Sequence, residues 1–185
     1  MNIKLLTPFK LIIATAVIVF ITALTVQAQD KTKLIGNKPR SGSANSSFSV
    51  IKGNQVAIKM KAGKKPVQLL KFSFDVENRD RDSLQFKVNV YPYDVSVGEN
   101  LVKQDITGTI HRGKNKINVD LEPYNIQAKG TVLVAIEWLK TDEGANPSFA
   151  IGLFNGGTYT YENNTWKKTP VAGVDFNVLV KKVSK

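Results

Sequence analysis

The segment VQLLKFSFDVENRDRDSLQFKVNVYPY, residues 67–93, gives the clearest strand pattern in the sequence. Apolar and polar residues alternate in both halves, a period of two that is typical of strands with one buried face. The apolar faces comprise Leu70, Phe72, Phe74 and Val76, then Leu84, Phe86, Val88 and Val90. The polar residues 78–82 between the halves are typical of a hairpin loop. We therefore predict that 67–77 and 83–93 pair as an antiparallel hairpin and that its apolar face covers a core.

The first 28 residues have the pattern of a secretory signal peptide. Lys4 and Lys10 precede an apolar run at 11–26, and Ala28 follows at the offset of a small cleavage residue. The run is slightly shorter than the ~17–25 residues that span a bilayer, which favours cleavage after Ala28 over the alternative of an uncleaved anchor. We therefore expect an exported protein, periplasmic or extracellular, with no stable membrane span once the signal peptide is removed.

Residues 29–185 have the length of one ordinary domain, and the whole sequence has an ordinary composition. The 185 residues include 26 Lys and Arg, 15 Asp and Glu, one His and no Cys, for a net charge of +11. The absence of Cys excludes thiol nucleophiles, thiolate zinc sites and disulfides. Residues 29–47, rich in Lys, Gly, Ser and Asn, are predicted to be a flexible entry segment with one edge strand, and residues 48–185 to form the folded domain.

Short strands and turn signals continue through the rest of the sequence. Further strands are predicted at 47–51, 55–61, 105–112, 116–121, 131–140, 148–154, 158–161 and 174–182. Residues 131–140 are apolar on both faces, which indicates an interior strand. Asn155-Gly156-Gly157 predicts a hairpin between its flanking strands, and 94–103 predicts a long crossing loop. With no helical period after residue 28, we predict an all-β fold, a two-sheet antiparallel β-sandwich of jelly-roll type.

Four short motifs resemble a known but uncharacterised domain. They are FKVNVY at 86–91, GENL at 98–101, VDL at 119–121 and EW at 137–138. Their order and spacing resemble a secreted β-sandwich domain of Bacteroidetes, which occurs alone or behind a carboxypeptidase-regulatory-like module. The resemblance covers about residues 34–181 and implies fold and compartment, but it supplies no catalytic residue.

Several polar residues that could take part in chemistry are predicted to have ordinary roles. His111 has no GxSxG or HExxH motif to accompany it, so a surface histidine is expected. Asp75 and Glu77 are expected on a solvated charged face. Asn78, Asp80 and Asp82 alternate like calcium ligands but are interrupted by arginines, so a charged turn is predicted instead. We predict no catalytic residue, no metal and no cofactor.

The favoured ligand-binding residues are aromatic side chains beside polar ones. Tyr91 and Tyr93 follow Asn89 on the polar face of one strand, and Trp166 lies in a predicted polar loop. Exposed rings beside amides and lysines suit the stacking and hydrogen bonding of a sugar, although cross-strand aromatic packing explains them too. Glu137, in mid-strand, either pairs with a Lys or Arg on the adjacent strand or acts on a ligand, as a general acid or by binding a ligand hydroxyl. Candidate ligand-binding residues are thus Tyr91, Trp166, Asn89, Tyr93 and Glu137.

The functional prediction is an exported, non-catalytic binding module at the cell envelope. Its partner is a glycan, the favoured ligand, or another envelope protein. Nucleic acid is not expected, because the lysines are spread over many strands without an RNA-binding aromatic motif. Two alternatives stay open. A structural or adhesion subunit would need an apolar patch or an open sheet edge, and a glycan hydrolase would need two convergent carboxylates.

Overall fold

The computed structural model describes residues 32–37, 44–79 and 82–183. The predicted signal peptide lies outside these residues. The described part contains twelve strands. They are β1 (Thr32–Gly36), β2 (Asn45–Ser47), β3 (Gln55–Asn78), β4 (Leu84–Pro92), β5 (Thr107–Ile110), β6 (Gly113–Asp120), β7 (Gln127–Trp138), β8 (Ser148–Leu153), β9 (Thr158–Glu162), β10 (Thr165–Thr169), β11 (Ala172–Val174) and β12 (Asn177–Lys182). The 3₁₀ helix η1 (Glu122–Tyr124) separates β6 from β7.

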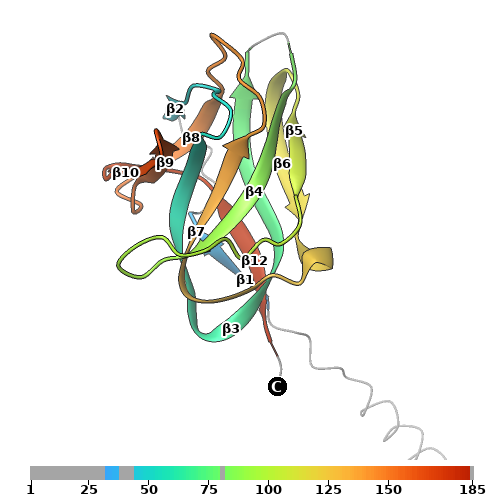
Figure 1. Ribbon diagram of the computed structural model, residues 1–185, viewed down its shortest axis with the longest axis vertical. Helices are drawn as coiled ribbons and strands as arrows, with labels where there is room; N and C mark the ends of the chain where they lie inside the picture. Colours follow the sequence, from blue (N-terminus) through green and yellow to red (C-terminus); the bar gives the residue numbers. More distant parts are fainter. Residues whose placement is uncertain (1–31, 38–43, 80–81, 184–185) are drawn as a thin grey trace, which may run out of the picture. The chain divides into compact units, whose positions relative to one another are not determined.

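The long strand β3 belongs to both layers of the sandwich (Figure 1). Its first half pairs with β7 and β9, and its second half pairs with β6, β12 and β8. The pairing with β7 shifts register on both sides of Gly63, whose φ of +111° favours glycine. We call β5, β4, β7, the first half of β3, β9 and β10 the front sheet, and β6, the second half of β3, β12, β1, β8, β2 and β11 the back sheet.

All pairings between these described strands are antiparallel, so the predicted all-β sandwich is confirmed. Phe72, Phe74, Phe86 and Val88 are buried together in its core, as expected. The prediction that 131–140 forms an interior strand is also confirmed, because β7 lies between β3 and β4. Among the described residues, no helix is long and apolar enough to cross a membrane.

The predicted central hairpin is wrong. Within the described chain β4 pairs with β5 and β7, while residues 67–78 of β3 lie in the back sheet. The two segments instead face each other across the core, where the rings of Phe74 and Phe86 pack 5.6 Å apart. The alternation identifies which side of a strand is buried, but it does not identify the neighbouring strand. Leu70 is only half-buried, since a register shift near this point puts Leu69 on the core side.

The second predicted hairpin is also misplaced. β8 pairs with β2, β3 and β11, and it does not pair with β9. The hairpin instead joins β9 and β10 through Asn163 and Asn164, whose φ angles of 51° and 60° suit a tight two-residue turn. The loop predicted to contain Trp166 is therefore a strand.

Two loop predictions are corrected by backbone hydrogen bonds and strand pairings. Residues 94–106 do not cross the molecule, because Leu101 donates to the carbonyl of Val90 and Val88 donates to that of Ile106. This segment therefore runs back along the edge of β4 and leads into β5. The predicted entry segment 29–47 contributes two strands, with β1 paired to β12 and β2 paired to β8. The described sandwich thus begins at Thr32, well before residue 48.

Candidate functional site

The outer face of the front sheet carries a cluster of aromatic side chains, which we call the aromatic face. Its members are Tyr91 of β4, Tyr93 just after the end of β4, Tyr159 and Tyr161 of β9, and Trp166 of β10. Strand register brings them together. Gln55 of β3 stands opposite Tyr161, which stands opposite Trp166. β9 and β10 thus extend the sheet beyond β3 and place their rings beside those of β4.

Small and aliphatic residues form the floor beneath these rings. Ala57, Leu133 and Ala135 point to the outer side of the sheet, yet all three are fully buried. The rings cover this floor because alanine leaves room for an aromatic side chain to lie close to the backbone. Tyr91 and Trp166 pack edge to face at 5.8 Å. The face therefore has an aromatic second core outside the main one.

Ring contacts extend across the whole cluster. Tyr161 and Trp166 have centroids 5.2 Å apart, and Tyr93 and Tyr159 have centroids 5.8 Å apart. Such pairs hold the rings in defined orientations and contribute about 0.5–1.5 kcal/mol each beyond their area burial. Tyr91, Tyr161 and Trp166 remain half-exposed, whereas Tyr159 is buried. The upper surface of the cluster is thus a fixed arrangement of partly exposed rings.

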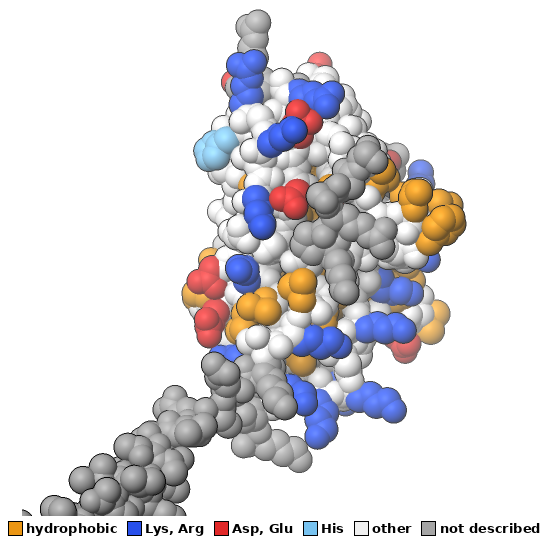
Figure 2. Space-filling view, turned by 180° about the vertical axis from the view of Figure 1, so that it is seen from behind, with side chains coloured by type: hydrophobic (Ala, Val, Ile, Leu, Met, Phe, Trp, Pro, Cys, Tyr) orange, Lys and Arg blue, Asp and Glu red, His pale blue; other side chains and the backbone are white. Residues whose placement is uncertain are grey.

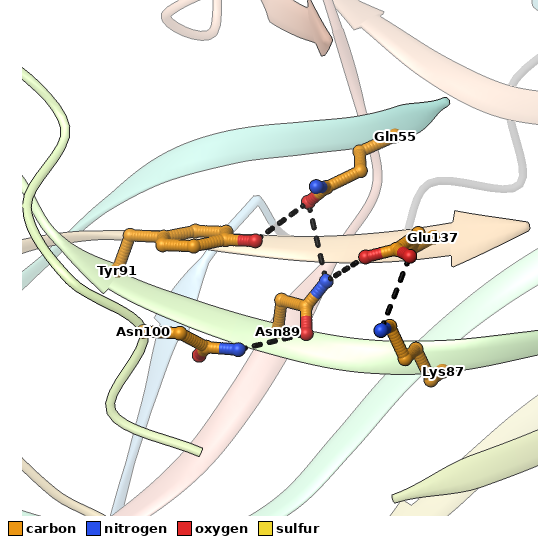
Figure 3. Close-up of polar contacts among 6 residues, drawn as sticks. All are labelled: Gln55, Lys87, Asn89, Tyr91, Asn100 and Glu137. Carbon is orange, nitrogen blue, oxygen red and sulfur yellow. Dashed lines mark hydrogen bonds and ion pairs between the residues drawn. The ribbon is translucent and has the colours of Figure 1, made fainter. Parts of the chain in front are cut away.

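A polar network lies beside the rings (Figure 3). Asn89 is its centre: its Nδ2 donates to Oε1 of Gln55 at 3.3 Å and to Oε2 of Glu137 at 2.7 Å. Its Oδ1 accepts from Nδ2 of Asn100 at 2.9 Å. Asn89 is only 3% exposed, and both of its amide hydrogens are engaged within the protein. Asn89 therefore holds the network together and is not available to contact a ligand directly.

Glu137 pairs with a lysine on the adjacent strand, which is one of the two arrangements expected from the sequence. Its Oε1 lies 3.1 Å from Nζ of Lys87, and the two side chains are 19% and 28% exposed. β4 and β7 place these two residues directly opposite each other. Because Lys87 and Asn89 both bind its carboxylate, Glu137 contributes no uncompensated negative charge to the face.

Tyr91 is less exposed than expected. Its hydroxyl donates to Oε1 of Gln55 at 3.1 Å, and its ring packs on Trp166, which is itself half-buried. Burial is the main cause that raises the pKa of Tyr91 above its usual value. Burial, together with the neighbouring hydroxyl of Tyr93, raises the pKa of Tyr159 to about 12. These phenols therefore stay neutral at physiological pH.

Asn100 was not identified from the sequence, although it fixes the loop beside the site. Its Oδ1 accepts from the backbone amides of Val90 and Val102, both at 3.1 Å, while its Nδ2 reaches Asn89. Gln55 was missed as well. Neither residue has a sequence signal, because an asparagine in a polar loop and a glutamine at a strand start are common.

The cavities described for this chain that could hold a ligand lie away from the aromatic face. One of about 420 Å³ on the back sheet is lined by Asp75 and Glu77 with Lys114 and Lys116. Each carboxylate stands opposite a lysine, since Asp75 pairs in register with Lys116 and Glu77 with Lys114. Figure 2, seen from behind, shows Lys and Arg side chains dispersed over this side and interspersed with Asp and Glu. The arrangement agrees with the predicted solvated charged face.

The other polar residues with possible chemical roles have structural or surface positions. His111 is exposed, and its Nδ1 lies 3.2 Å from Oγ of Ser83. Asn78 donates to the carbonyl of Asp82 at 2.8 Å and so closes the arch between β3 and β4. Asp80 lies outside the described residues. In the part of the chain that the structure describes, no three His, Cys, Asp or Glu side chains gather as a metal site would require.

Comparisons with known proteins support the fold only. No family model matches the sequence, and no curated protein matches it. The resemblance to a secreted Bacteroidetes domain therefore stays a prediction. Among solved structures, the clostridial cysteine protease Cwp84, in a variant form after propeptide cleavage, matches with a TM-score of 0.58 and 15% identity over 85% of this chain and 41% of that one.

A second structure of the same protein gives a similar result. It contains the cysteine protease and lectin-like domains of Cwp84, a surface layer associated protein of Clostridium difficile, and matches with a TM-score of 0.51 and 14% identity over 78% of this chain and 37% of that one. A family two carbohydrate esterase from Clostridium thermocellum has a TM-score of only 0.33, at 10% identity over 76% of this chain and 33% of that one. The chain thus spans less than half the length of these structures.

Proposed function

We propose that this chain is an exported, non-catalytic module that binds carbohydrate at the cell envelope, and that the aromatic face is its binding surface. The observation that carries the proposal is the set of half-exposed rings, Tyr91, Tyr161 and Trp166, fixed on one sheet beside a polar network. Sugar rings present C–H groups that pack on aromatic faces, and their hydroxyls bind polar groups around the rim.

The rings suit binding because they are already ordered. Tyr161 and Trp166 contact each other and lie on adjacent, directly paired strands. Side chains that are fixed before binding lose little conformational entropy when a ligand arrives. The likeness to a structure that includes a lectin-like domain is compatible with this proposal, although it extends to the fold alone.

Ligand binding by the aromatic face can be tested on the chain that begins at Gln29. A glycan array identifies a ligand, and calorimetry then measures its affinity for wild type and for Trp166→Ala. Loss of one aromatic anchor should weaken binding by about 1–3 kcal/mol, roughly 5- to 150-fold. Tyr124→Ala is the matched control, because Tyr124 is an exposed tyrosine on η1, outside the aromatic face.

Stability must be measured alongside affinity. Trp166 and Tyr91 pack on each other, so either alanine variant should also lower the melting temperature, unlike a purely exposed anchor. The proposal fails if Trp166→Ala remains folded and binds every ligand of the wild type with unchanged affinity. In that case the rings serve only to pack the sheet.

One observation favours a second candidate, a self-associating structural subunit of the envelope. Leu153, Phe154 and Val171 form an apolar patch, with exposures of 52%, 87% and 51%. The backbone amide of Phe154 donates to the carbonyl of Val171 at 2.7 Å, and its φ of 57° is unusual for a bulky residue. Sedimentation velocity distinguishes this candidate: concentration-dependent association that Phe154→Ser abolishes would favour it, and a monomer in both proteins would exclude it.

A further inference from the structure

We propose that the saccharide held by the aromatic face is acidic, and that Lys59 and Lys168 bind its carboxylate or sulfate groups. This inference rests on the proposed function and specifies its ligand class. The geometry that carries it is a row of four side chains, in which two lysines lie at the ends of an edge-to-face tyrosine pair.

The row crosses the front sheet from β3 to β10. Nζ of Lys59 lies 5.0 Å from the ring centroid of Tyr93. Tyr93 packs on Tyr159 with centroids 5.8 Å apart, and Nζ of Lys168 lies 5.7 Å from the centroid of Tyr159. Cation–π contacts of this kind hold an ammonium group over the ring, and both lysines remain exposed to solvent. The two charges are therefore positioned at the rim of the aromatic face.

Neither ammonium group is neutralised by the protein. Both lysines are exposed, and among the described residues neither forms an ion pair. The network carboxylate cannot serve them, because Glu137 is bound by Lys87 and Asn89. The face therefore presents positive charge that a ligand anion can satisfy.

Two polar groups beside the rings are already engaged within the protein. The hydroxyl of Tyr91 is engaged with Gln55, and the amide hydrogens of Asn89 are engaged with Gln55 and Glu137. Lys59 and Lys168 add charged donors to this face that no carboxylate among the described residues binds. Hydrogen bonds in which one partner is charged are shorter and stronger than neutral ones, so an acidic sugar fits these donors best.

The test compares an acidic oligosaccharide with its neutral counterpart. We would measure binding of hexagalacturonate, of its methyl ester and of a heparin hexasaccharide to the chain that begins at Gln29. At least one acidic ligand should bind about tenfold or more tightly than the ester, with an affinity that falls as salt is raised. Lys59→Met and Lys168→Met should each weaken the affinity for the acidic ligand about fivefold or more, because each substitution removes one charged contact.

Lys71→Met is the matched control. Lys71 is an exposed lysine of the second half of β3, opposite Asp120 of β6, so the substitution removes the same charge from the back sheet. It should leave acidic binding unchanged. An equal loss in Lys71→Met would show a net-charge effect and overturn the inference, as would binding in which neither acidic ligand exceeds the ester in affinity. If a neutral glycan binds and needs Trp166, the inference fails and the proposed function survives. If no glycan binding depends on Trp166, the proposed function fails as well.

Discussion

Replacing Asn89 with alanine should destabilise the protein without removing any atom that faces solvent. The substitution deletes one hydrogen bond to the carboxylate of Glu137 and two to the neutral amides of Gln55 and Asn100. A bond to a charged group contributes about 1.5–3 kcal/mol, and a neutral one about 0.5–1.5 kcal/mol. Since Glu137 keeps Lys87 and Gln55 keeps Tyr91, part of the loss is recovered. We therefore expect a net loss of about 2–4 kcal/mol.

Urea unfolding followed by circular dichroism measures this loss, with Asn118→Ala as the control. Asn118 is an exposed residue of β6, and its Oδ1 accepts one hydrogen bond from Oγ of Ser73 at 2.9 Å. The control should cost no more than about 1 kcal/mol. If Asn89→Ala also costs less than about 1 kcal/mol, the network does not organise this side of the sheet.

Three further predictions follow from burial, from a raised pKa and from the sequence. Phe86→Ala should cost about 3–5 kcal/mol in urea unfolding, and a loss below about 1 kcal/mol would contradict its core position. The pKa of Tyr159 is raised from 10.0 to about 12, so the folded state favours the neutral phenol; the resulting stability is present below pH 10 and is lost as the pH rises towards 12. The free energy of unfolding, measured against pH, should therefore fall less between pH 10 and 12 in Tyr159→Phe than in wild type. An identical pH profile in the two proteins would contradict this. N-terminal sequencing of the protein from its native host should begin at Gln29, and recovery of intact Met1 in the membrane fraction would contradict export with cleavage.

The sequence predicts which side of each strand is buried, because burial depends on the local alternation of side chains. Phe72, Phe86 and Val178 are all buried as their alternation indicates. It does not predict which strands are neighbours. The polar residues between β3 and β4 are compatible with a hairpin and with an arch between sheets, and only the packing of the whole core selects the arch.

The candidate site was predictable where one strand carries it and unpredictable where several strands meet. Tyr91 and Asn89 share a face of β4, so their proximity follows from the period of two. Gln55 approaches them only because β7 pairs with both β3 and β4, and Tyr161 only because β9 pairs with β3. Trp166 joins the cluster through the Asn163–Asn164 turn, a hairpin signal that the stronger glycine signal at 155–157 obscured.

Packing and ligand binding are compatible roles for the aromatic face. The rings lie close to the sheet because Ala57 and Ala135 are small, and this contact buries one side of the cluster while the other stays accessible. Rings held in this way stabilise the sheet and are fixed before a ligand arrives, so binding costs little entropy. Lys87 compensates the negative charge of Glu137, so this carboxylate adds no net charge to the aromatic face. Selectivity between acidic and neutral ligands would then depend on the lysines that form no ion pair, Lys59 and Lys168. The stability of the ring cluster would not distinguish the two kinds of ligand.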